Sequence, residues 1–66
     1  MYDYILKRAL EERKIISIMY QKGNEFTQRN VKIININGND IEAYCYLRHQ
    51  IRHFKKDNIL AAVYTP

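Results

Sequence analysis

The stretch Phe26–Asn37, FTQRNVKIININ, decides the fold class expected for this chain. It is rich in β-branched residues, which favour a strand. Val31 and Ile33 share one parity along it. Ile34 and Ile36 share the other, so strict alternation would place the two pairs on opposite faces of a sheet. A bulge or sharp bend at this change of phase resolves the conflict, as happens where a sheet curls into a barrel.

Turn signals on both sides of this strand divide the chain into hairpins. Gly23-Asn24 precedes it, and Asn37-Gly38 follows it, where both residues readily take positive φ. Further on, Ile41, Ala43 and Cys45 alternate with polar or aromatic residues, as expected for a half-buried strand. The predicted strands cover residues 14–22, 25–37, 40–48, 51–56 and 60–65.

The N-terminal stretch predicts a helix over residues 3–13, because apolar residues recur there at three- and four-residue spacing. Arg8 lies four residues before Glu12 and can form an ion pair with it on the helix surface. The predicted fold is therefore mainly β, a single domain over residues 1–66. We expect a small Sm-like or SH3-like five-stranded antiparallel β-barrel with an N-terminal α-helix.

Size and charge limit the classes of function. A chain of 66 residues buries little apolar surface, so self-association is expected to help stabilise it. Its net charge of +4 favours anionic partners. A single cysteine is typical of a reducing cytoplasm, and the longest apolar run, Ile15–Tyr20, is far too short to span a membrane.

No residue pattern favours catalysis or a metal site, so we expect a non-enzymatic protein with no cofactor and no metal. Cys45 falls on the predicted core face, where an apolar environment would raise its pKa and leave it unreactive. Cys45, His49 and His53 are four residues apart, a spacing that converges on a helix but not on strands. The carboxylates are scattered along the sequence, and no pair indicates acid–base chemistry.

The remaining candidate is a basic and aromatic group between Tyr44 and Lys56. Arginine binds phosphate through two parallel hydrogen bonds, and tyrosine offers both a stacking face and a hydroxyl. One interpretation is a surface for a nucleotide or a single strand of nucleic acid. The other is an exposed sheet face on which tyrosines pack beneath solvated arginines and lysines.

The segment Ala43–Ile59, AYCYLRHQIRHFKKDNI, resembles the WYL domain family. Its sharpest feature is the pattern L-R-x-x-x-R-x-F from Leu47 to Phe54. Upstream, a strand ending in Tyr20 and a second strand bearing Arg29 are similar to the opening of the family. The chain departs from the pattern where Asn39-Asp40-Ile41 replaces the Trp-Tyr-Leu that names the family, and where Asn58 replaces a common arginine. The chain is therefore identified as a stand-alone, partly degenerate member.

The resemblance implies an Sm-like barrel that serves as the ligand sensor of a bacterial or phage transcription regulator. It implies phosphate contacts from the arginines, hydroxyl contacts from the tyrosines and stacking by the phenylalanine. The implied contact residues are Tyr20, Arg29, Tyr44, Arg48, Arg52 and Phe54. His53, Lys55 and Lys56 would add an electrostatic rim.

Two hypotheses for the partner follow. In the first, the domain binds single-stranded nucleic acid or a nucleotide-like ligand. In the second, it is a protein-interaction or oligomerisation module without a small ligand, which pairs its last strand with another copy or with a regulator protein. Neither hypothesis involves a membrane.

Overall fold

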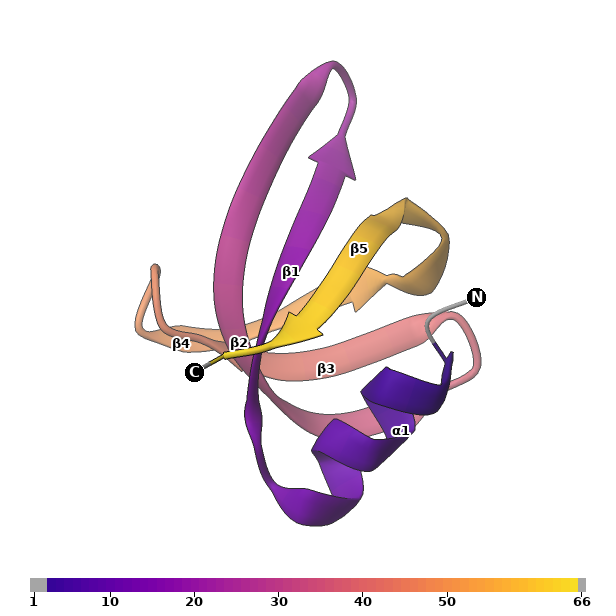
Figure 1. Ribbon diagram of the computed structural model, residues 1–66. Coiled ribbons are helices and arrows are strands. Elements are labelled where there is room, and N and C mark those ends of the chain that lie inside the picture. Colours follow the sequence, from indigo (N-terminus) through magenta and orange to yellow (C-terminus); the bar gives the residue numbers. More distant parts are fainter. Residues whose placement is uncertain (1–2, 66) are drawn as a thin grey trace.

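The computed structural model describes residues 3–65, which form one helix, five strands and a short 3₁₀ helix. Figure 1 shows their arrangement, with α1 packed beneath a strongly curved sheet. The elements are α1 (Asp3–Glu12), β1 (Ile15–Lys22), β2 (Glu25–Asn37), β3 (Asp40–Cys45), β4 (Gln50–Lys55), η1 (Lys56–Asn58) and β5 (Ile59–Tyr64).

The strands form one antiparallel sheet in the order β4-β3-β2-β1-β5. The prediction of a mainly β fold with five antiparallel strands and an N-terminal helix is confirmed. The predicted barrel is not closed by strand pairing, because β4 and β5 are both edges of the sheet. Side chains bridge part of this gap, since the Lys55 N–H of β4 donates to the Tyr20 hydroxyl of β1 at 3.2 Å.

The predicted bulge in β2 is confirmed. Ile33 pairs with Ala43 and Asn35 pairs with Glu42, which leaves Ile34 as the additional residue. Ile33 is buried, whereas 45% of Ile34 is exposed. The bulge therefore restores the inward direction of Ile36, which packs against the core despite its opposite parity.

The hairpin turns differ slightly from expectation. Gly38 and Asn39 form the two-residue connection between β2 and β3, and only Gly38 has positive φ. Asn37 instead remains in β2, paired with Asp40. A glycine at the first turn position supplies the backbone twist that a two-residue hairpin needs, so positive φ at Asn37 is not required.

The core lies between α1 and one face of the sheet, and every buried residue within 3–65 is apolar or cysteine. α1 contributes Leu6 and Ala9, which point to the same side of the helix. The buried residues are Leu6, Ala9, Ile16, Ile18, Val31, Ile33, Ile41, Ala43, Cys45, Phe54, Ile59 and Ala62.

β3 is shorter than the predicted strand over residues 40–48, because it ends at Cys45. The chain turns through residues 46–49 instead of at 49–50, and His49 takes a left-handed conformation with φ of 56°. Arg48 therefore lies in the turn, and the alternation of side chains along β3 does not determine which way it points. Within residues 3–65, no helix has the length and apolar character needed to span a membrane.

Candidate anion-binding site

A hollow of about 460 Å³ opens on the core-facing side of the sheet, beyond the part that α1 covers. Strand alternation explains its polar lining. Ile16 and Ile18 enter the core and Tyr20 follows on the same face of β1, while Arg29 precedes the core residue Val31 by two positions in β2. We call it the arginine hollow. Its lining residues are Tyr20, Lys22, Glu25, Thr27, Arg29, Asp40, Arg48, Arg52, His53, Phe54, Lys55 and Asn58.

Five of the six predicted contact residues line the arginine hollow, although they come from four separate segments of the chain. β1 supplies Tyr20 and β2 supplies Arg29. The turn after β3 supplies Arg48, and β4 supplies Arg52 and Phe54.

Tyr44 is the predicted contact residue that lies elsewhere. It sits between the buried residues Ala43 and Cys45 in β3, so alternation turns its side chain to the opposite face of the sheet. There its ring packs edge-to-face on Tyr46, with ring centroids 5.0 Å apart. Tyr44 and Arg48, both implied as contact residues by the resemblance, therefore lie on different surfaces, because the chain leaves the strand before Arg48.

The three arginines of the hollow have no acidic partner in the described part of the chain. Within residues 3–65, no carboxylate lies within ion-pair distance of Arg29, Arg48 or Arg52. Arg29 donates to the Thr27 hydroxyl at 3.3 Å, which holds its guanidinium against the hollow wall. These arginines thus keep most of their hydrogen-bond donors available for an anion.

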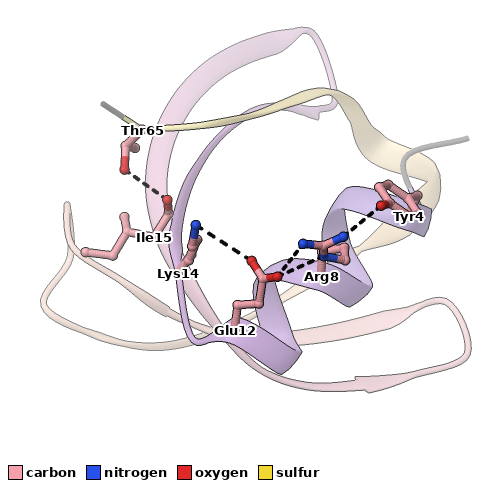
Figure 2. Close-up of polar contacts among 6 residues, drawn as sticks. All are labelled: Tyr4, Arg8, Glu12, Lys14, Ile15 and Thr65. Atoms are coloured by element: carbon pink, nitrogen blue, oxygen red, sulfur yellow. Dashed lines mark hydrogen bonds and ion pairs between the residues drawn. The ribbon is translucent and has the colours of Figure 1, made fainter.

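Arg8 in α1 shows the contrasting arrangement (Figure 2). Its Nε donates to a Glu12 carboxylate oxygen at 3.0 Å and its Nη1 donates to the Tyr4 hydroxyl at 2.8 Å. The predicted pair between Arg8 and Glu12 is confirmed. An arginine occupied in this way has little left to offer a ligand.

Tyr20 and Phe54 form the aromatic wall of the hollow, with ring centroids 4.9 Å apart in an edge-to-face contact. Only 3% of Phe54 is exposed, so little of its ring is available to stack on a base. Tyr20 is half-buried, and its hydroxyl accepts the hydrogen bond from the Lys55 N–H. Phe54 therefore supports the wall, and Tyr20 presents the more accessible ring.

The predicted rim divides in two. His53 and Lys55 line the hollow, whereas Lys56 lies outside it and binds Asp3 with Nζ 2.7 Å from Oδ1. His53 Nδ1 lies 2.9 Å from Asp40 Oδ2. The hydrogen bond and charge of Asp40 raise the pKa of His53 above its ordinary value, with slight opposition from burial.

Cys45 is buried as predicted, but its surroundings are not purely apolar. Arg29 Nη1 lies 3.7 Å from its sulfur. Burial raises the pKa of the Cys45 thiol. Three groups lower this pKa by hydrogen bonding to the sulfur: the backbone N–H of Arg48, the Arg29 guanidinium and the backbone N–H of Leu47. Their combined effect exceeds that of burial, so the pKa of Cys45 lies below its ordinary value. The expected raised pKa was wrong because the turn after β3 directs N–H groups at the sulfur.

Sequence reasoning missed five residues of the lining: Lys22, Glu25, Thr27, Asp40 and Asn58. Alternation could have found Thr27 and Lys22, which lie two positions from Arg29 and Tyr20 on the same strand faces. Asn58 belongs to η1 and occupies the position where the WYL pattern has an arginine. In the part of the chain that the structure describes, no three His, Cys, Asp or Glu side chains form a metal-binding group.

The sequence matches no family model and no curated protein. The chain has a WYL-like fold, a helix followed by a curled five-stranded sheet. A similar solved structure is proteasome accessory factor B/C of Arthrobacter aurescens, with a TM-score of 0.84 and 20% sequence identity. The match covers 96% of this chain and 11% of that chain. At this level of identity the likeness concerns the fold alone.

Proposed function

We propose that this domain is a non-enzymatic ligand-sensing module that binds single-stranded nucleic acid or a nucleotide-like anion in the arginine hollow. One observation carries the proposal: Arg29, Arg48 and Arg52 line the same hollow and have no carboxylate partner within residues 3–65. Uncompensated guanidiniums attract phosphate strongly because the planar fork matches two phosphate oxygens.

The charge of the whole hollow agrees with this function. Its lining holds five lysine and arginine side chains against two carboxylates, which leaves a formal charge of +3 without His53. Glu25 lies directly opposite Lys22 in the hairpin register, and Asp40 contacts His53. Each carboxylate thus has a cationic or titratable neighbour. The arginines therefore dominate the electrostatic potential in the hollow.

A regulatory role is supported by the fold. The similar domain lies within a protein described as an accessory factor and accounts for 11% of that chain. A small sensing module of this kind would act on a regulator partner, within one chain or between chains.

The test is Arg48→Ala combined with Arg52→Ala. We expect the double variant to lose at least about tenfold in affinity for a short fluorescein-labelled oligothymidylate, because two charge-assisted contacts are removed. Stability should change by about 0.5 kcal/mol or less per substitution, since neither arginine is fully buried or ion-paired. Fluorescence anisotropy at low and physiological salt measures the affinity, and binding should weaken as salt rises.

The matched control is Arg8→Ala combined with Arg13→Ala, which removes the same charge away from the hollow. This variant should bind almost as tightly as the natural protein. Equal losses in the two double variants would point to non-specific attraction by net charge. A folded natural protein that binds no oligonucleotide or mononucleotide at low salt would refute the proposed function.

The second candidate is an assembly module, and the edge strand β5 favours it. The three apolar side chains Leu60, Val63 and Tyr64 are each at least 40% exposed there. An unpaired edge with apolar side chains can add a strand from another chain. Light scattering over a range of concentrations should detect self-association that Val63→Lys weakens. A strict monomer that retains oligonucleotide binding would separate the two candidates.

A further inference from the structure

The lining of the arginine hollow contains one side chain whose charge changes near neutral pH. Its other ionisable side chains belong to residue types whose ordinary pKa values lie outside the interval from about pH 5.5 to 8. His53 is the exception, because imidazole titrates within this interval. It is also in direct contact with Asp40, at 2.9 Å between Nδ1 and Oδ2.

The neighbours of His53 determine which way its charge acts. β3 is the strand paired with β4, and it places Asp40 and Glu42 beside the imidazole, with Glu42 directly opposite. Lys55 follows two positions along β4 on the same strand face. The hydrogen bond and charge of Asp40 are the largest causes that raise the pKa of His53; the charge of Glu42 raises it further, and burial opposes the shift. Protonation therefore begins closer to neutrality than in an unperturbed histidine.

Building on the binding function proposed above, we propose that the arginine hollow takes up a proton together with its anion, through the His53–Asp40 pair at its rim. When His53 is neutral, the Asp40 carboxylate repels an approaching phosphate. When His53 is protonated, it compensates Asp40 and raises the formal charge of the lining from +3 to +4. Affinity for an anion should thus increase as pH falls through the raised pKa of His53, and the gain should disappear as pH rises above it.

Linkage gives a second consequence. If protonation strengthens anion binding, the bound anion must strengthen protonation by the same factor. The titration midpoint of His53 should therefore move upward when the hollow is occupied. His49 lies in the turn after β3 and does not line the hollow, so a bound anion should leave its ring-proton signals unchanged at a given pH.

The effect is expected to be moderate. The His53 side chain is 61% exposed and that of Asp40 is 49% exposed, so water and salt screen the added charge. We expect about a threefold gain in affinity between about pH 8 and pH 5.5 at low salt.

The experiment measures anisotropy of a labelled oligothymidylate without terminal phosphates, since a terminal phosphate itself titrates near neutrality. The natural protein should show the gain in affinity. His53→Gln keeps a neutral donor for Asp40 and should bind equally at both pH values. His49→Asn is the matched histidine control, because asparagine tolerates the left-handed backbone at this position, and it should retain the gain.

Asp40→Asn supplies an independent check. Removal of the carboxylate should increase affinity at about pH 8 and move the His53 ring-proton midpoint, followed by NMR, to lower pH. Saturating probe should move that midpoint upward in the natural protein. A pH dependence that persists unchanged in His53→Gln, or a midpoint that the probe leaves in place, would overturn the inference while the binding function stands. Absence of binding at both pH values would overturn both proposals.

Discussion

Arg13 occupies a backbone conformation that suits glycine better than arginine. It follows the last residue of α1 and has φ of 55°. The Lys14 N–H donates to the Ala9 carbonyl at 3.1 Å, and the Arg13 N–H donates to the Leu10 carbonyl at 3.4 Å. This pair of hydrogen bonds ends a helix when the intervening residue is left-handed, a state in which a Cβ atom crowds the backbone. The helix therefore ends at Glu12, one residue earlier than predicted.

Arg13→Gly should stabilise the protein by about 0.5–1 kcal/mol, because the relief of this crowding exceeds the additional backbone entropy that glycine loses on folding. Denaturant unfolding followed by circular dichroism measures the change. Arg13→Ala is the control, since it removes the guanidinium but retains Cβ, and it should give no such gain. If Arg13→Ala stabilised the protein equally, the gain would come from removal of the guanidinium charge and not from relief of backbone crowding.

Tyr20 contributes to stability through its hydroxyl as well as its ring. Tyr20→Phe should lower the free energy of unfolding by about 1 kcal/mol, because the Lys55 N–H loses its acceptor. The edge-to-face contact with Phe54 would be retained. Thermal unfolding measures the difference, and an unchanged stability would show that water replaces the hydroxyl as acceptor.

At the scale of elements, the bulge in β2 lets both halves of this strand direct apolar side chains into the core, although their apolar residues differ in parity. Before the bulge, Arg29, Val31 and Ile33 alternate onto the core side of the sheet. After it, Ile36 does so with opposite parity. Because a bulge bends its strand and increases the local twist, β2 can follow a strongly curved sheet over 13 residues.

Two adjacent isoleucines test the position of the bulge. Ile33→Ala should lower the free energy of unfolding by about 2–5 kcal/mol, because it leaves a cavity in the core. Ile34→Ala should change it by about 0.5 kcal/mol or less, because the side chain is partly solvated. Urea unfolding compares the two variants directly. Similar losses would place Ile34 in the core and contradict the register.

At the scale of the whole molecule, contacts distant in sequence hold the two ends of the chain in place. Lys56 of η1 binds Asp3 of α1. Figure 2 shows the second contact, in which the Thr65 hydroxyl donates to the Ile15 carbonyl at 2.9 Å. The η1 turn is fixed further by the Asp57 N–H, which donates to the Asn39 side chain at 3.1 Å. Helix, turn and last strand are thereby tied to the same small core.

The pair between Asp3 and Lys56 predicts a dependence of stability on pH. The hydrogen bond and charge of Lys56 lower the pKa of Asp3 below its ordinary value of 3.8. A lowered pKa in the folded state contributes stability above the unfolded value, and that contribution is lost as pH falls through the folded pKa. The difference in Tm between the natural protein and Lys56→Gln should thus be larger near neutral pH than in strong acid.

The neighbouring Lys55→Gln is the control for this measurement, because Lys55 forms no ion pair within residues 3–65. Its difference in Tm should not shrink in acid in the same way. A constant difference for Lys56→Gln across the range would mean that its effect comes from packing of the side-chain stem.

The candidate site could be predicted only in part. The residues of the L-R-x-x-x-R-x-F pattern are adjacent in sequence, so Arg48 and Arg52 were identifiable as a basic group. Tyr44 was placed correctly on the face of β3 opposite the core, but Arg48 leaves that face because β3 ends at Cys45. The end of β3 depends on where β2 stops pairing with it. Arg29 lies 19 positions before Arg48, and local periodicity carries no information about the distance between them.

The sequence by itself determined the order of helix and strands, the two glycine turns, a bulge or bend near Ile33–Ile34 and the alternation of the core. These features depend on backbone preferences and side-chain period over a few residues, which are local properties. Tertiary structure alone decided that the sheet stays open at β4 and β5, that Cys45 meets a guanidinium, and that arginines from three segments share a hollow. Those outcomes depend on the curvature of the sheet and on the residues at which strand pairing ends. Both are set by contacts between residues far apart in the chain, so local sequence patterns do not reveal them.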